Sequence, residues 1–253
     1  MTRIFRSVRI DSIFNTKFNK YFLYVLGEIL LIVIGILIAL KINNNNKLHE
    51  NSKKEILYLK SFQEDLKKDI GFIKYEIQRN EYLYSKLEDV FQDYPELKNK
   101  SEKELLEISN GLSLISSQNN FVCNRSTFEA IQNSSDIQVI SDFNLVQLLF
   151  NYYTHLNVII THDELSNEFI RNKVEPYIFD KLELRTIDFI AEWYENDQRK
   201  SEKRLSDIYT DYKFENILIG SRDRTESYLS IYKKALMLAE ELYLILDEKT
   251  NPE

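Results

Sequence analysis

The residues best suited to chemistry are the three histidines of this 253-residue chain. His155 and His162 are seven residues apart in a stretch that predicts a helix, so they share a face but stand two turns apart. Helical histidines on one zinc ion are usually four residues apart. A metal site would therefore need Asp163 or Glu164 and a further element, and two structural histidines are the simpler interpretation. His49 is expected in solvent, and no metal site is predicted.

Other sequence patterns of catalysis do not occur in this chain. It has no glycine-rich phosphate loop, no G-x-S-x-G and no H-E-x-x-H. Adjacent acids such as Glu64 with Asp65 and Glu240 with Glu241 are expected on solvated faces, because catalytic carboxylates need a pocket. Cys123 is the only cysteine, and a small buried apolar role is expected for it. The sequence thus predicts no catalytic or cofactor-binding residue, no cofactor and no enzyme.

The element that must position the rest is residues 21–40, which read YFLYVLGEILLIVIGILIAL. At 1.5 Å per residue, this helix would cover the roughly 30 Å of a bilayer's hydrocarbon core. A buried core helix would show a polar face. A signal peptide would have a shorter apolar run with a cleavage site. A surface-lying helix would have a basic face. None of these fits, so residues 21–42 are predicted to be a single transmembrane helix.

One charged residue, Glu28, lies within this apolar run. At 100° per residue, Gly35 and Ala39 return to within about 20° of the Glu28 direction, and Ile32 lies between them. Small residues on such a stripe let two helices approach closely, and a carboxylate in hydrocarbon tends to face protein or water. The predicted transmembrane interface is therefore Glu28, Ile32, Gly35 and Ala39. The alternative is that Glu28 lies near the headgroups and reaches the aqueous surface.

Composition and charge narrow the class of the protein. Five glycines and three prolines are few for a turn-rich β fold or a dinucleotide-binding fold, so an all-α chain is predicted. The first 40 residues carry net charge +3, from five basic residues and two acids, which leaves −10 for the remainder of a chain of net charge −7. An acidic soluble part is unsuited to nucleic acid, which needs a basic face.

Three regions follow: a basic juxtamembrane tail (1–20), the transmembrane helix (21–42) and a soluble helical domain (43–253). Five Lys or Arg residues flank each side of the span, so the positive-inside rule is nearly balanced. Acids dilute the basic residues on the C-terminal side, which favours a cytoplasmic tail and an external domain. The expected architecture is an elongated antiparallel helical bundle behind a single membrane span.

Apolar spacing and capping signals predict the helices of the soluble domain. They are expected at 48–94 before Pro95, from Ser101 with Glu104 as a capping box, from Ser126 or Thr127, from Ser141 or Asp142 to just before Pro176, at 184–195 with Trp193, and from 211–214 to about Lys249. Residues 134–140 alternate weakly and predict an extended segment, and 176–180 predict a break. Residues 43–46 are all asparagine, so the helix could continue or break there. The 48–94 helix is expected within the bundle, with a coiled-coil stalk as the alternative. Arg125 and Glu129 are expected to form a helix ion pair or to brace an elbow.

Two stretches resemble an uncharacterised bacterial family of single-span membrane proteins, a domain of unknown function with the signature GEI-x-L-x-VIGI-x-IAL-x-INNWN. The first stretch matches at Gly27, Glu28, Ile29, Gly35, Ala39, Leu40, Asn43, Asn44 and Asn46, and a looser second motif matches at Thr127, Phe128, Ile140, Tyr152 and Tyr153. Asn45 replaces the usual tryptophan, and Ser135 with Asp136 stands where the family usually has a glycine. The resemblance implies a protein of the bacterial inner membrane with a periplasmic helical domain, and it implies no activity.

The function expected from these observations is that of a membrane-anchored helical protein that acts through protein–protein contacts, as an adaptor, scaffold or sensor-like module. Its expected partners are the lipid bilayer and a second copy or another membrane protein. The alternative is a sensory bundle that binds a small molecule between helices lined by tyrosine and phenylalanine.

Overall fold

A computed structural model of the protein describes residues 17–183 and 205–251. Within these ranges the chain is helical and contains no strand, which confirms the predicted all-α class. The elements are α2 (Lys17–Asp93), η1 (Tyr94–Asn99), α3 (Glu102–Gly111), η2 (Ser113–Ser116), α4 (Ser126–Asn133), η3 (Asp136–Val139), α5 (Phe143–Phe169), the π-helix η4 (Ile170–Val174), α6 (Glu175–Lys181), α8 (Leu205–Tyr209) and α9 (Tyr212–Thr250). The helix predicted at 184–195, with Trp193, and most of the basic tail lie outside the described residues.

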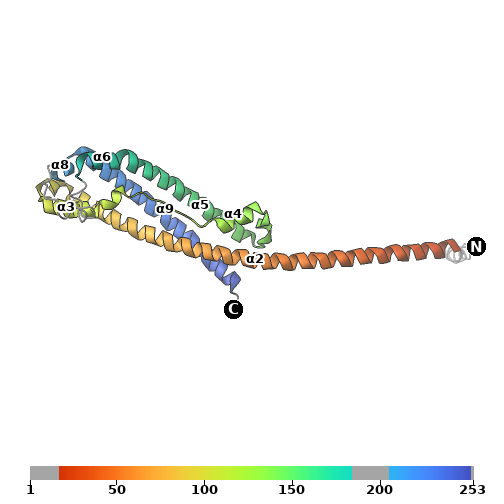
Figure 1. Ribbon diagram of the computed structural model, residues 1–253. Coiled ribbons are helices and arrows are strands. Elements are labelled where there is room, and N and C mark those ends of the chain that lie inside the picture. Colours follow the sequence, from red (N-terminus) through yellow and green to blue (C-terminus); the bar gives the residue numbers. More distant parts are fainter. Residues whose placement is uncertain (1–16, 184–204, 252–253) are drawn as a thin grey trace, which may run out of the picture. The chain divides into compact units, whose positions relative to one another are not determined.

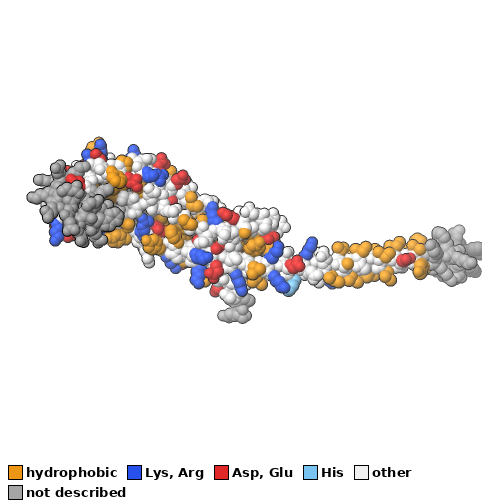
Figure 2. Space-filling view, in the orientation of Figure 1, with side chains coloured by type: hydrophobic (Ala, Val, Ile, Leu, Met, Phe, Trp, Pro, Cys, Tyr) orange, Lys and Arg blue, Asp and Glu red, His pale blue; other side chains and the backbone are white. Residues whose placement is uncertain are grey.

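The chain divides into two compact units, Met1–Ile56 and Leu57–Glu253. In the first unit, α2 continues without interruption through the four asparagines at 43–46. The large apolar side chains of 22–42 are exposed around the helix, for example Leu31 at 73% and Leu37 at 58%. Figure 2 shows hydrophobic side chains covering most of this part of α2. Among the described helices, α2 alone is long and apolar enough to cross a membrane, and none of that apolar window is buried.

The second unit is built on the C-terminal part of α2 together with α5 and α9, which lie side by side (Figure 1). Apolar residues at helical spacing on all three helices bury one another in a shared core, because a helix with an apolar stripe needs a partner surface. The core includes Phe62, Leu66 and Ile73 from α2, Leu145, Leu149 and Leu156 from α5, and Ala235, Leu242 and Leu246 from α9. A second cluster lies around Leu87, Leu105 and Leu218 and includes residues of α2, α3 and α9.

Helix α9 runs antiparallel to the other two helices. Gln63 donates a hydrogen bond to Asp247, whereas Arg222 pairs with Glu88, so the start of this part of α2 meets the end of α9. Helix α5 shows the same order against α9, since Lys249 pairs with its N-cap residue, Asp142. Helices α2 and α5 therefore run parallel to each other. This pair differs from the antiparallel arrangement predicted from the sequence.

Local signals account for most helix ends. Ser101 and Glu104 form the predicted capping box, in which the Ser101 backbone N–H donates to Glu104 Oε2 at 2.8 Å. Asp142 caps α5 by accepting from the backbone of Asn144 at 2.9 Å and of the next residue. Asp211 caps α9 in the same way by accepting from the backbone of Lys213. Such caps satisfy N–H groups that the first helical turn leaves free.

Two expectations about local structure were wrong. Residues 136–139 form the 3₁₀ helix η3 and not an extended segment, because Ser135 enters it in the left-handed conformation with φ 59°. The chain also stays helical through Pro176, where a break was predicted. Pro176 lies in the first turn of α6, and the π-helix η4, in which the Glu175 N–H donates to the Ile170 carbonyl, links α5 to α6.

Candidate functional site

The predicted transmembrane interface lies on exposed surface of α2. Glu28, Ile32, Gly35 and Ala39 are all exposed, as the flanking apolar residues are. A methyl group added at Gly35 would meet no other atom within 4 Å. The stripe is thus open to a partner helix, and its role as an interface stays a prediction.

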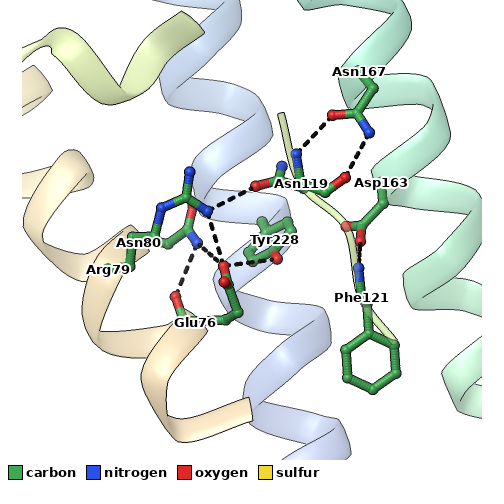
Figure 3. A network of polar contacts seen from close by, with 8 residues as sticks. All are labelled: Glu76, Arg79, Asn80, Asn119, Phe121, Asp163, Asn167 and Tyr228. Carbon is green, nitrogen blue, oxygen red and sulfur yellow. Dashed lines mark hydrogen bonds and ion pairs between the residues drawn. The ribbon is translucent and has the colours of Figure 1, made fainter. Parts of the chain in front are cut away.

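A second candidate site lies inside the Leu57–Glu253 unit, where residues 117–125 form a segment without helix. This 117–125 segment lies between α2 and α5 (Figure 3). Its side chains alternate, with Phe121 buried and Asn119 and Cys123 half-buried, whereas Asn120 and Val122 are exposed. That period of two is typical of extended backbone.

Buried extended backbone must find hydrogen-bond partners, because an unpaired buried N–H or C=O is costly. Side chains of the neighbouring helices supply them. The amide of Asn167 accepts from Asn119 N–H at 2.8 Å and donates to Asn119 C=O at 2.6 Å. Asp163 Oδ2 accepts from Phe121 N–H at 2.9 Å. These α5 side chains thus hold the segment as a neighbouring strand would.

On the α2 side the segment is held by Asp69, which is only 1% exposed. Asp69 Oδ1 accepts from the backbone N–H and the side-chain amide of Asn124, and Oδ2 accepts from the Tyr152 hydroxyl at 2.8 Å. Burial raises the pKa of Asp69, and these hydrogen bonds oppose that shift. Asp65, expected on a solvated face, is instead buried and accepts a 2.6 Å hydrogen bond from Thr127.

Further along α2, Glu76 is the centre of a polar cluster (Figure 3). Its Oε2 atom pairs with Arg79 at 3.1 Å and accepts from the Tyr228 hydroxyl of α9 at 3.3 Å. Asn80 donates to the backbone carbonyl of Glu76, and Arg79 also reaches Asn119 Oδ1 at 3.4 Å. One network therefore joins α2, the 117–125 segment and α9.

Asp163 is a buried carboxylate that is only partly satisfied. Its Oδ1 atom and the Tyr232 hydroxyl are both buried, and neither makes a hydrogen bond within the described part of the chain. Burial, reinforced by the charge of Glu76, raises the pKa of Asp163 to about 6, although the Phe121 N–H bond opposes the shift. The carboxylate thus orders the backbone at an electrostatic cost.

The two helical histidines contact α9. His155 Nε2 lies 2.9 Å from the carbonyl oxygen of Ile231, and the His162 ring lies 5.8 Å from the Tyr228 ring. Burial lowers the pKa of His162, with help from the positive charge of Arg224. In the ranges 17–183 and 205–251, no group of three or more His, Cys, Asp or Glu residues is placed to hold a metal ion.

Arg125 and Cys123 have structural surroundings. The Arg125 guanidinium donates to the backbone carbonyl of Tyr153 and to Asn157, both in α5, so it braces the start of α4 against α5. This agrees with the elbow alternative, and no Arg125–Glu129 ion pair is seen in the described residues. Burial raises the pKa of the Cys123 thiol, which makes the thiolate scarce.

The sequence interpretation missed the buried acids of α2. Asp65, Asp69 and Glu76 lie four and seven residues apart, on the face that also carries Phe62 and Ile73. Their burial could have been predicted from their spacing, since these acids recur in register with the apolar stripe of the helix. A solvated acid should instead fall on the opposite face. Nothing in the sequence indicates which backbone groups they would bind.

Comparison with known families gives one match: the profile of a family of unknown function, DUF6090, matches residues 28–156. The match begins within the apolar part of α2 and ends in α5, so it includes Asp69, Glu76 and the whole 117–125 segment but not α9. Neither the curated proteins nor the solved structures give a match. Because the matched residues make up half of the sequence, the chain belongs to the DUF6090 family of unknown function.

Proposed function

We propose that this protein is a single-pass membrane protein that acts through protein–protein contacts, with its helical domain as the interacting module. The observation that carries the membrane span is that nearly all the apolar side chains of 22–42 are exposed and none is buried. Removing a large apolar side chain from water is worth roughly 1.5–3 kcal/mol, so more than ten of them on one helix strongly favour transfer of that helix into an apolar medium. A lipid bilayer supplies the missing cover.

The proposed location is the bacterial inner membrane, with the Leu57–Glu253 unit in the periplasm. The resemblance and the uneven dilution of basic residues support this orientation. Alkaline phosphatase, which is active only outside the cytoplasm, should be active when fused after residue 253. A green fluorescent protein fused at the same position should be dark. The reverse pattern would contradict the orientation while leaving the membrane span intact.

The proposed contact within the membrane is the stripe of Glu28, Gly35 and Ala39, which meets a second copy of the same helix or a partner helix. Small residues allow close approach, and polar contacts between membrane helices contribute about 0.6–1.7 kcal/mol. Glu28→Leu and Gly35→Ile should therefore each weaken helix association by about three- to twentyfold, seen as a lower signal in a transmembrane dimerisation reporter.

Matched controls lie on other faces of the same helix. Gly27→Ile makes the same exchange as Gly35→Ile but about 100° away from the Glu28 direction, and Leu37→Ala changes the opposite face. Both controls should keep the reporter signal, and all variants should remain in the membrane fraction after alkaline carbonate extraction. An unchanged signal in both Glu28→Leu and Gly35→Ile would contradict the stripe.

The alternative, a small-molecule sensor, receives less support from the interior of the helical domain. The pocket among α2, α5 and α9 has a volume of about 40 Å³, whereas sites for drug-sized ligands usually have 300–1,000 Å³. Two larger hollows, of about 280 Å³ beside Phe128, Phe150 and Tyr153 and of about 600 Å³ beside Tyr82, are more open to solvent. Polar and apolar residues both line the small pocket, and several of the domain's tyrosine and phenylalanine rings pack against one another instead. Tyr228 and Tyr232, for example, are stacked at 4.1 Å.

A further inference from the structure

A small pocket of about 40 Å³ lies beside the Glu76 cluster, inside the Leu57–Glu253 unit. It is lined by residues of α2, η2, the 117–125 segment, α5, η4 and α9, so many elements of the unit contribute to it. Its polar lining includes two arginines, Arg79 and Arg224, and no Asp or Glu. Glu76, beside the pocket, compensates only Arg79, so the charge of Arg224 is left to attract an anion.

The two arginines differ in how their charges are compensated. Arg79 is paired with Glu76 at 3.1 Å. Arg224 has no ion pair with any residue of the described chain, and its Nε–H is buried without a hydrogen-bond partner. Its charge is felt nearby, because it contributes to the lowered pKa of His162. A buried N–H without a partner is unfavourable, so the pocket favours an acceptor that would complete it.

Packing around Phe169 holds the Arg224 guanidinium in place. The guanidinium carbon lies 4.0 Å from the centre of the Phe169 ring, in cation–π contact. On the preceding turn of α9, a β-carbon at Gly220 would come within 2.8 Å of the same ring. Phe169 therefore packs directly on the α9 backbone and presents its ring to Arg224. The next residue, Ile170, begins the π-helix η4, a distortion that is frequent at functional sites.

Hydroxyl groups complete the polar part of the lining. Ser166, Ser221, Thr225 and Tyr228 all line the pocket and are all buried. Thr225 and Tyr228 already donate, to the Ser221 carbonyl and to Glu76. The Ser221 hydroxyl, on a residue only 7% exposed, makes no hydrogen bond in the described structure and is free to donate into the pocket.

We propose that this pocket is a binding site for a small carboxylate, held by the planar fork of Arg224 and by the Ser221 hydroxyl. Guanidinium groups bind carboxylates through two parallel hydrogen bonds. A pocket of 40 Å³ has room for about three water-sized groups, which matches formate or acetate and is small for phosphate. This ligand site does not depend on the proposed membrane contact.

The test measures thermal unfolding of the full-length protein in mild detergent during titration with sodium formate or acetate. Ionic strength is held constant by replacing chloride, so that general salt effects cancel. At a tenfold excess over its Kd, a ligand specific for the folded state should raise Tm by about 3 to 6 °C, and the rise should saturate. Phosphate at the same ionic strength should give no saturable rise.

Variants locate the effect. Arg224→Gln should abolish the saturable rise, and Ser221→Ala, which removes only one hydroxyl, should weaken it. The matched control is Arg222→Gln: Arg222 lies two residues away and pairs with Glu88 outside the pocket, so the variant should be less stable yet keep the full carboxylate response. Two results with the carboxylates would overturn the proposal: an equal response in Arg224→Gln and wild type, or no response to formate or acetate. A response to phosphate alone, or a Tm that falls as chloride is withdrawn, would overturn it as well.

Discussion

Replacing Asp163 by asparagine measures the cost of keeping a carboxylate in the core. In the folded state the pKa of Asp163 is raised from 3.8 to about 6, mainly by burial. A raised carboxyl pKa means that the folded state holds its proton more tightly than the unfolded state does. The group therefore favours folding below about pH 4, and this contribution is lost as pH rises through 6.

The magnitude follows from the pKa difference. At 1.36 kcal/mol per unit, the change from 3.8 to about 6 corresponds to a loss of about 3 kcal/mol in the free energy of unfolding between pH 3 and pH 7.5. Asparagine keeps an oxygen that can accept from Phe121 N–H and carries no charge. The difference in stability between Asp163→Asn and wild type should therefore grow by about 3 kcal/mol in favour of the variant over this pH range.

The assay is denaturant unfolding of the full-length protein in detergent, followed by far-ultraviolet circular dichroism at several pH values. Comparing variant with wild type at each pH cancels the other titrating groups. Asp223→Asn, at an exposed position of α9, controls for the loss of one charge and should give a nearly constant difference. Asp163→Ala removes the acceptor as well and should lose about 1–3 kcal/mol, most clearly at low pH. Parallel pH profiles for Asp163→Asn and wild type would refute the reasoning.

Two further substitutions test the backbone geometry by denaturant unfolding. Gly220→Ala should destabilise the protein by about 1–3 kcal/mol, because the new β-carbon would lie 2.8 Å from the Phe169 ring, whereas Gly71→Ala, in open space on α2, should stabilise it by about 0.5–1 kcal/mol. Equal effects at the two glycines would contradict the close packing. Ser135→Gly should stabilise by about 1 kcal/mol, because Ser135 has φ 59° and is exposed, and a loss of stability would show that its hydroxyl matters more than its backbone.

The helices could be predicted from the sequence because their signals are local. Ser101 with Glu104, and the aspartates at 142 and 211, lie within four residues of the N–H groups that they cap. The apolar spacing of α2, α5 and α9 likewise reports which face of each helix is buried. The error at Pro176 has the same origin, because a proline ends a helix or begins one depending on what precedes it.

The buried polar site could not be predicted in the same way, because its partners are distant in sequence. Asp163 is 42 residues from Phe121, and Asp69 is 55 residues from Asn124. Residues 117–125 contain no cluster of β-branched residues that would predict a buried strand. The one hint of extended backbone is an alternation along the segment: Asn119, Phe121 and Cys123 are more buried than Asn120 and Val122, which lie between them.

The parallel pair of α2 and α5 explains why this core contains acids. After α2, the chain must return along the helices before α5 can run in the same direction. An extended residue advances about 3.3 Å and a helical residue 1.5 Å, so the nine residues of the 117–125 segment cover about 30 Å, which a helix would need about 20 residues to span. The short return leaves buried backbone N–H groups without helical partners. Asp69, Asp163 and Asn167 satisfy them. The burial of Asp69 and Asp163 is thus the consequence of a connection made with extended chain, and the raised pKa of Asp163 is the electrostatic cost of that connection.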